Sequence, residues 1–209
     1  MRHRAAISAD SKYCTKAFKR FCRAAICLSV LVAASFPAVV RSTEHALAED
    51  LAGKGVDPFA ISSGRVVVLL FVRTDCPISN RYAPLVQKLS EKFRGKANFW
   101  LVYPDAAETP AQIRAHDQEF RYSIPALRDI RRQLVKRAQV TITPEAAVFD
   151  AGGKLLYHGR IDNRYVDFGR SRQAATTHEL EDAVTAALAG KTVKLDHANA
   201  VGCYISDLK

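Results

Sequence analysis

The sequence predicts an α/β fold in which a central mixed sheet is flanked by helices. Three observations lead to this prediction: a continuous apolar run at 66–72, apolar residues at helical spacing directly after it, and a second strand and helix pattern over 97–121. An apolar run without alternation is typical of a strand that is buried on both faces. Strands that alternate with helices form parallel units with right-handed crossovers. We therefore expect the first two strands to lie parallel at the centre of one sheet.

The remaining elements follow from start and stop signals along the chain. Pro77 and Pro110 stand at first helical positions, Thr109 and Asp129 can cap helices, and Gly190 ends the last one. The pattern predicts an irregular lead-in at 43–60, strand 65–73, helix 77–94, strand 97–104, helix 110–121, an extended piece at 123–127, helix 130–139, a hairpin of strands at 145–150 and 154–162, an irregular segment at 163–177 and helix 178–190.

Residues 1–42 have the composition of an export signal. Eight of the 31 basic residues but only one of the 21 acidic residues lie there, and the segment includes an apolar run over 24–40. A basic region, an apolar region and then small residues are the layout of a secretory signal, with 40–42 as one possible cleavage site. The run also reaches the lower length limit of a spanning helix, so an uncleaved membrane anchor is the alternative. We expect a periplasmic or other extracytoplasmic location.

The charge that remains outside this segment is close to balanced. Residues 43–209 carry a net charge of only +3 of the total of +10. A high isoelectric point that comes from a targeting segment does not indicate a nucleic-acid partner. We therefore predict no nucleic-acid binding.

Only two cysteines, Cys76 and Cys203, lie outside the N-terminal segment. Two cysteines in an exported domain most often form one structural disulfide. Cys76 has a different context, because it follows the buried strand and precedes Pro77 at a predicted helix start. The unpaired N–H groups and the dipole of a helix N-terminus favour the thiolate, which is the reactive form of cysteine. The sequence thus predicts sulfur redox chemistry at Cys76.

Three segments of the chain resemble the thioredoxin-like family. They are DCPISNRY at 75–82, ITPEAAVFDAGGKLLYHGRID at 142–162 and GCYI at 202–205. More narrowly, the chain is similar to exported redoxins, which include alkyl hydroperoxide reductase/thiol-specific antioxidant-like and cytochrome-maturation thioredoxin-like proteins. The resemblance covers about residues 56–190. It implies a thioredoxin-like fold, a thiol–disulfide oxidoreductase that needs no cofactor, and thiols or disulfides of proteins or small molecules as partners.

The resemblance also implies roles for individual residues. Cys76 would be the attacking sulfur, and Ser79 stands where thioredoxins have their second cysteine. Ser79 would either hydrogen-bond the thiolate or serve only as a polar residue of the first helical turn. Pro144 matches the cis-proline of the fold, whose loop, here with Thr143, lies against the active cysteine and pairs with a substrate strand.

Cys203 is the candidate resolving thiol. It lies in the tail 191–209, which we expect to be outside the core fold, as is the lead-in 43–55 at the N-terminal end of the domain. Gly202, directly before Cys203, would make the tail flexible. A distal thiol can resolve a mixed disulfide or a sulfenic acid when the local second cysteine is missing. A permanent bridge to Cys76 and an unpaired surface thiol are the alternatives.

Two other functions stay open. Peroxiredoxins, which would confer antioxidant activity, carry Thr or Ser three residues before the reactive cysteine, where this chain has Arg73 followed by Thr74. Arg73 would then supply a cation near the thiolate. A copper carrier without turnover would need Cys76, Cys203 and one histidine from the set His158, His178 and His197. No ligand spacing in the sequence supports such a site, so we predict no metal.

Overall fold

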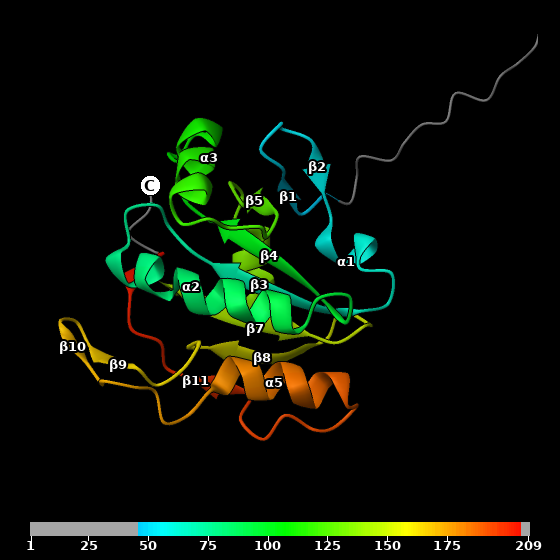
Figure 1. The fold of residues 1–209 in the computed structure, drawn as a ribbon. Coiled ribbons are helices and arrows are strands. Elements are labelled where there is room, and N and C mark those ends of the chain that lie inside the picture. The colour runs from blue at the N-terminus through cyan, green and yellow to red at the C-terminus, as the bar shows by residue number, and fades with distance from the viewer. Residues whose placement is uncertain (1–45, 206–209) are drawn as a thin grey trace, which may run out of the picture. The chain divides into compact units, whose positions relative to one another are not determined.

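The computed structural model describes residues 46–205, and the predicted targeting segment 1–42 lies outside this range. These residues belong to one compact unit. Its main sheet contains eight strands in the order β11 (His197–Ala198), β8 (Leu155–Gly159), β7 (Glu145–Phe149), β3 (Val66–Phe71), β4 (Ala97–Tyr103), β5 (Ala126–Arg128), β1 (Ala48–Glu49) and β2 (Gly55–Val56). As predicted, β3 and β4 are parallel and central, whereas β7 runs antiparallel to its neighbours β3 and β8 (Figure 1).

Helices cover both faces of this sheet. The helices are α1 (Pro58–Ile61), α2 (Pro77–Lys92), α3 (Pro110–Glu119), α4 (Gln133–Ala138) and α5 (Glu179–Leu188). All six residues of β3 are buried, and alternate ones belong to two different apolar clusters. One cluster contains side chains of α2, α3 and α5, and the other contains side chains of α4. This double burial explains the continuous apolar run that predicted the strand.

The predicted lead-in is more ordered than its composition suggested. β1 and β2 pair as an antiparallel hairpin, and Glu49 of β1 pairs with Arg128 of β5, so the hairpin extends the edge of the main sheet. The expectation of irregular chain was wrong here because strands of two residues carry no detectable periodicity. The segment 163–177 also contains a short hairpin, β9 (Tyr165–Asp167) and β10 (Arg170–Ser171).

The C-terminal tail is part of the fold, contrary to the prediction that it lies outside the core. β11 adds a parallel strand to β8, with Ala198 opposite Gly159. A Cβ atom at Gly159 would lie 2.2 Å from the Ala198 carbonyl oxygen, so glycine is required for this approach. Farther along, β12 (Cys203–Tyr204) pairs antiparallel with β6 (Ile142–Thr143) in a separate two-stranded sheet. The tail is therefore fixed by strand pairing at two places.

Within residues 46–205, no helix is long and apolar enough to cross a membrane.

Arg132 is the N-cap residue of α4, but the Asp129 side chain, expected to cap this helix, binds the N–H groups of its first turn and provides a pH-dependent prediction. The buried Asp129 carboxyl accepts hydrogen bonds of 2.8 Å from the N–H groups of Gln133 and Val135. Burial outweighs these bonds and raises the pKa of Asp129 from 3.8 to about 6. Because the pKa is higher in the folded state than in the unfolded state, the stability contributed by this group falls as the pH rises from about 4 to about 6.

We expect the free energy of unfolding of the wild type, relative to Asp129→Asn, to fall by about 2 kcal/mol between pH 4 and pH 7. Urea denaturation at the two pH values measures this difference. Asp167→Asn in the exposed β9–β10 hairpin is the control for removal of one carboxyl group. A difference between wild type and Asp129→Asn that stays constant with pH would contradict the prediction.

Candidate redox site at Cys76 and Cys203

Cys76 lies between the central strand and the first long helix. It is the N-cap residue of α2, with extended backbone angles, and Pro77 occupies the first helical turn behind it. The loop that leads from β3 to Cys76 is held by a buried carboxylate, because the Thr74 N–H donates to Glu108 Oε1 at 2.6 Å. The Asn80 side-chain amide also donates to the Thr74 carbonyl oxygen, at 3.1 Å. The cysteine is thus fixed at the N-terminal end of α2, as the sequence predicted.

The structure brings Cys76, Cys203, Thr143 and Pro144 together. Cys76 and Cys203 are both free thiols, and their Sγ atoms are 3.1 Å apart. A disulfide bond is about 2.05 Å long, so a small movement separates this dithiol from a bridge. The Cys76 thiol also lies 3.2 Å from the Thr143 carbonyl oxygen. The peptide bond from Thr143 to Pro144 is cis, as the resemblance implied.

The two thiols differ in acidity. Burial disfavours the Cys76 thiolate, but hydrogen bonds from the Ser79 hydroxyl, the Ser79 and Ile78 backbone N–H groups and the Cys203 thiol outweigh it and lower the pKa of Cys76. Burial, the hydrogen bond to Cys76 and the charge of that neighbour raise the pKa of Cys203 to about 12. Deprotonation of the pair therefore places the negative charge on Cys76, and Cys203 keeps its proton.

Ser79 contributes to this difference. Its side chain is buried, and within residues 46–205 its hydroxyl has no hydrogen-bond partner, so it is available to donate to the Cys76 thiolate once that forms. This favours the thiolate-stabilising alternative over a merely polar first-turn residue. A hydroxyl that is free to donate stabilises the charged form of the sulfur.

We expect Ser79→Ala to raise the pKa of Cys76, because it removes a donor to the thiolate. Loss of a hydrogen bond to a charged group should slow alkylation of Cys76 at neutral pH by on the order of tenfold. Thiolate absorbance against pH measures the shift. Ser90→Ala is the matched control, since that hydroxyl lies on the same helix and donates to the Gln87 carbonyl oxygen. Identical titration curves for the wild type and Ser79→Ala would contradict the assigned role.

Arg73 pairs with neighbouring carboxylates, and its role as a cation near the Cys76 thiolate stays a prediction. Its guanidinium group forms an ion pair with Asp75 at 2.9 Å and lies 3.8 Å from an Asp105 carboxylate oxygen. The Asp75 side chain is 67% exposed. The positive charge of Arg73 opposes the increase in the pKa of Cys203, whose sulfur contacts that of Cys76.

Two buried carboxylates that position the site were missed in the sequence. Glu145 Oε2 accepts hydrogen bonds from the N–H groups of Thr141 and Ile142, at 2.9 and 3.2 Å, and so holds the segment that leads to Pro144. Glu108 holds the loop before Cys76, and burial raises its pKa. Only the position of Glu145 directly after Pro144 hinted at its role, because both contacts depend on how separate loops meet.

The structure does not assemble the copper site that was considered. Among the residues that it describes, no group of three or more His, Cys, Asp and Glu side chains could hold a metal ion. His158 and His197 instead pack against each other across β8 and β11, with ring centroids 4.4 Å apart and ring planes tilted by 39°. His178 is the N-cap residue of α5.

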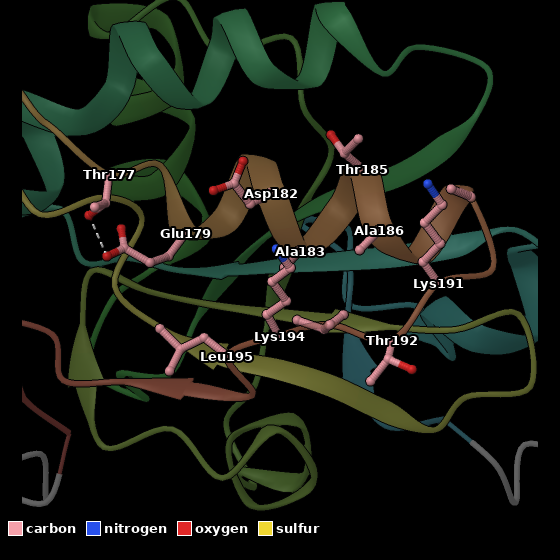
Figure 2. Close-up of a pocket in the computed structure, with 12 residues that line it drawn as sticks. Thr177, Glu179, Asp182, Ala183, Thr185, Ala186, Lys191, Thr192, Lys194 and Leu195 are labelled. Atoms are coloured by element: carbon pink, nitrogen blue, oxygen red, sulfur yellow. Dashed lines mark hydrogen bonds between the residues drawn. The ribbon is translucent and has the colours of Figure 1, made fainter.

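A pocket of about 550 Å³ lies beside α5 and belongs to a different part of the molecule. Small and polar residues of α5 line one side, and the chain at 191–195 lines the other, with Lys194 and Leu195 below the helix (Figure 2). None of the residues that line it belongs to the cysteine site. The candidate chemistry is therefore not located in this pocket.

Comparisons with known proteins agree with this geometry. Residues 64–155, which include Cys76 and Pro144 but not Cys203, match the family model described as thioredoxin-like. An uncharacterized conserved protein from Geobacillus kaustophilus is similar in structure, with a TM-score of 0.67, 20% identity, and coverage of 76% of this chain and 86% of that one. A hypothetical protein from Sinorhizobium meliloti 1021 has a TM-score of 0.65 and 22% identity, covering 76% of this chain and 88% of its own.

A third structure, a thioredoxin-like protein in its oxidized form, has a TM-score of 0.50 and 19% identity, with coverage of 65% of this chain and 86% of that one. No curated protein sequence matches this chain significantly. At such identities, the structural similarities establish the fold. The order of strands, the cis-proline loop and these similarities show that this chain has a thioredoxin-like fold, and its residues 64–155 match the thioredoxin-like family model.

Proposed function

We propose that this chain is a thiol–disulfide oxidoreductase in which Cys76 is the nucleophile and Cys203 is the resolving thiol. One observation carries the proposal: the two sulfur atoms are 3.1 Å apart and have opposite shifts in pKa. A thiolate with a lowered pKa attacks a disulfide, and a protonated thiol in contact with it is available for the second exchange. Two cysteines that formed only a permanent structural disulfide would not need such a difference in pKa.

The reaction has two exchange steps. The Cys76 thiolate attacks one sulfur of a substrate disulfide, so that a Cys76–substrate disulfide forms and the other substrate sulfur leaves as a thiolate. Cys203 then attacks the Cys76 sulfur, which forms the Cys76–Cys203 disulfide and releases the second substrate thiol, and its proton passes to a leaving thiolate. The substrate gains two electrons and the two cysteines lose two. A dithiol partner reverses these steps and restores the reduced chain.

Export belongs to the same proposal. The basic and apolar pattern of residues 1–42 supports an extracytoplasmic location, where disulfides form and persist. In such a compartment, a reactive cysteine pair would meet disulfides as substrates.

The proposal is tested by mixing the reduced chain with glutathione disulfide. We expect the Cys76–Cys203 disulfide to form and two glutathione molecules to be released per chain, as followed by peptide mapping without reductant. Hydrogen peroxide in a parallel reaction tests the alternative activity, since rapid peroxide consumption that depends on Cys76 would favour a thiol peroxidase. A chain that stays fully reduced in glutathione disulfide would contradict the proposal.

A further inference from the structure

A chain of polar side chains links α3 and the end of β4 to the loop between β3 and α2. Tyr103 Oη lies 2.8 Å from His116 Nδ1 and 2.9 Å from Asp117 Oδ1. His116 Nε2 lies 2.8 Å from Asn80 Oδ1, and the Asn80 amide donates to the Thr74 carbonyl oxygen at 3.1 Å. Tyr103 and His116 are buried, so their polar atoms depend on these contacts. The side chains form a relay with four members: Asp117, Tyr103, His116 and Asn80.

The relay ends on both sides of Cys76. Asn80 belongs to the first turn of α2, directly after Ser79, and its side chain reaches back to the Thr74 carbonyl oxygen. This hydrogen bond ties the chain before Cys76 to the chain after it. The sulfur is thereby kept near the N–H groups of Ile78 and Ser79, which lower its pKa.

The hydrogen atoms of the relay can be assigned from its end at the loop. A carbonyl oxygen only accepts, so Asn80 presents its NH₂ group to Thr74 and its oxygen to His116. His116 therefore donates from Nε2. In a neutral imidazole this leaves Nδ1 as an acceptor, so the Tyr103 hydroxyl donates to it. That hydroxyl has one hydrogen, and its contact with Asp117 then needs a hydrogen from the Asp117 carboxyl.

All contacts of the relay are thus matched only when it holds one proton more than an ionised aspartate and a neutral histidine carry. The surroundings favour this proton on Asp117. Burial raises the pKa of Asp117 to about 6, although the hydrogen bond from Tyr103 opposes the increase. Burial also lowers the pKa of His116, and the charge of Glu119 opposes this change. The titratable groups around the relay are Glu119 on α3, Glu108 before it and Tyr122 after it.

Loss of this proton above about pH 6 leaves one contact without a hydrogen. The Tyr103 hydroxyl then donates to the ionised Asp117, because a hydrogen bond to a charged group is roughly twice as strong as a neutral one. His116 takes up the tautomer with its hydrogen on Nδ1 and donates to the Tyr103 oxygen. Its Nε2 lone pair now faces the Asn80 oxygen, so this contact is lost and the partly exposed Asn80 side chain turns to water.

We propose that the relay is a proton-dependent positioning device for Cys76, in which His116 and Asn80 hold the loop before the cysteine while the relay is protonated and release it when the proton leaves through Asp117. The inference rests on the proposed function and assigns positioning residues to it. The relay members act through the position of the sulfur. The device stabilises the Cys76 thiolate most in acidic surroundings, where a thiolate is otherwise scarcest.

Asp117→Asn provides the first test, because an amide can donate to the Tyr103 oxygen at every pH. The relay should then stay matched while Cys76 titrates, and the acidity constant of Cys76 should be about threefold larger than in the wild type. Thiolate absorbance against pH measures it in the full-length reduced chain. Glu119→Gln is the matched control, since it removes an exposed carboxylate from the same helix. Equal constants in the wild type and Asp117→Asn, or the same increase in Glu119→Gln, would overturn the proposal.

Asn80→Ala separates the relay from a direct effect of the Asp117 charge. This variant cuts the link between His116 and Thr74, and circular dichroism checks that it is folded. In this background, Asp117→Asn should no longer change the acidity constant of Cys76. An increase that persists without the Asn80 side chain would show that the charge acts through space, and the relay would be wrong.

Nitrogen NMR of the His116 ring reads the position of the hydrogen directly. In the wild type, we expect it on Nε2 at about pH 5 and on Nδ1 at about pH 8, because the hydrogen bond at one ring nitrogen sets the state of the other. In Asp117→Asn it should stay on Nε2 at both pH values. A wild-type ring that keeps its hydrogen on Nε2 throughout would contradict the proton-dependent release.

Glutathione disulfide separates this inference from the proposed function. If it oxidises the wild type to the Cys76–Cys203 disulfide but Asp117→Asn leaves the acidity constant unchanged, the proposed function stands and the relay is wrong. If the variants behave as expected but glutathione disulfide does not oxidise the chain, the proposed function fails while the relay still sets the acidity of Cys76.

Discussion

Replacement of Cys76 by serine should abolish thiol–disulfide exchange, with a loss of rate of at least about a hundredfold. Serine fills almost the same volume in this fully buried position but offers no thiolate. The remaining thiol cannot substitute, because burial is the largest cause of the raised pKa of Cys203 and remains in the variant. The rate of glutathione disulfide reduction at neutral pH measures the effect.

The control for Cys76→Ser is a fold check by circular dichroism and urea denaturation, since the cysteine belongs to the apolar cluster beneath α2. Activity that persists in a folded Cys76→Ser chain would show that Cys203 reacts directly with substrates. The difference in acidity between the two thiols would then have no catalytic meaning.

Replacement of Cys203 by serine should stop the reaction after its first step. Cys76 keeps the hydrogen-bond donors of Ser79 and Ile78 in α2, which lower its pKa. It should therefore still attack glutathione disulfide. Without a resolving thiol, the chain should accumulate as a one-to-one mixed disulfide with glutathione and release one glutathione molecule instead of two. Mass spectrometry of the intact chain and of its peptides identifies the adduct and its position at Cys76.

Tyr204→Phe serves as the control for a change in the same strand, because that side chain is exposed and its backbone pairing is retained. It should release two glutathione molecules, as the wild type does. Normal turnover of Cys203→Ser, without any adduct, would show that resolution does not require this thiol.

Much of the fold could be predicted from the sequence because its strongest signals come from burial. β3 is apolar on both faces, and α2 follows it with a proline in its first turn. The two-residue strands β1, β11 and β12 could not be predicted, because each is stabilised by the strand that it joins and not by its own pattern. Short strands of this kind depend on tertiary context.

The candidate site could be predicted in part. Cys76 was found from its position between a buried strand and a helix, Pro144 from the resemblance to the thioredoxin-like family, and Cys203 because few cysteines remain outside the N-terminal segment. The role of Gly202 was misjudged: the prediction was flexibility, whereas this glycine allows the tail to approach the Thr143 carbonyl closely. Such a contact joins residues about 60 positions apart, and no local pattern encodes it.

The central claim is that Cys76 and Cys203 form a reversible redox pair. The most direct measurement is peptide mapping without reductant after equilibration in glutathione buffers of graded potential. We predict that a Cys76–Cys203 disulfide opens and closes within the range that such buffers cover. A bridge that stays closed throughout would make the pair structural, and two thiols that stay free throughout would contradict the two-cysteine mechanism.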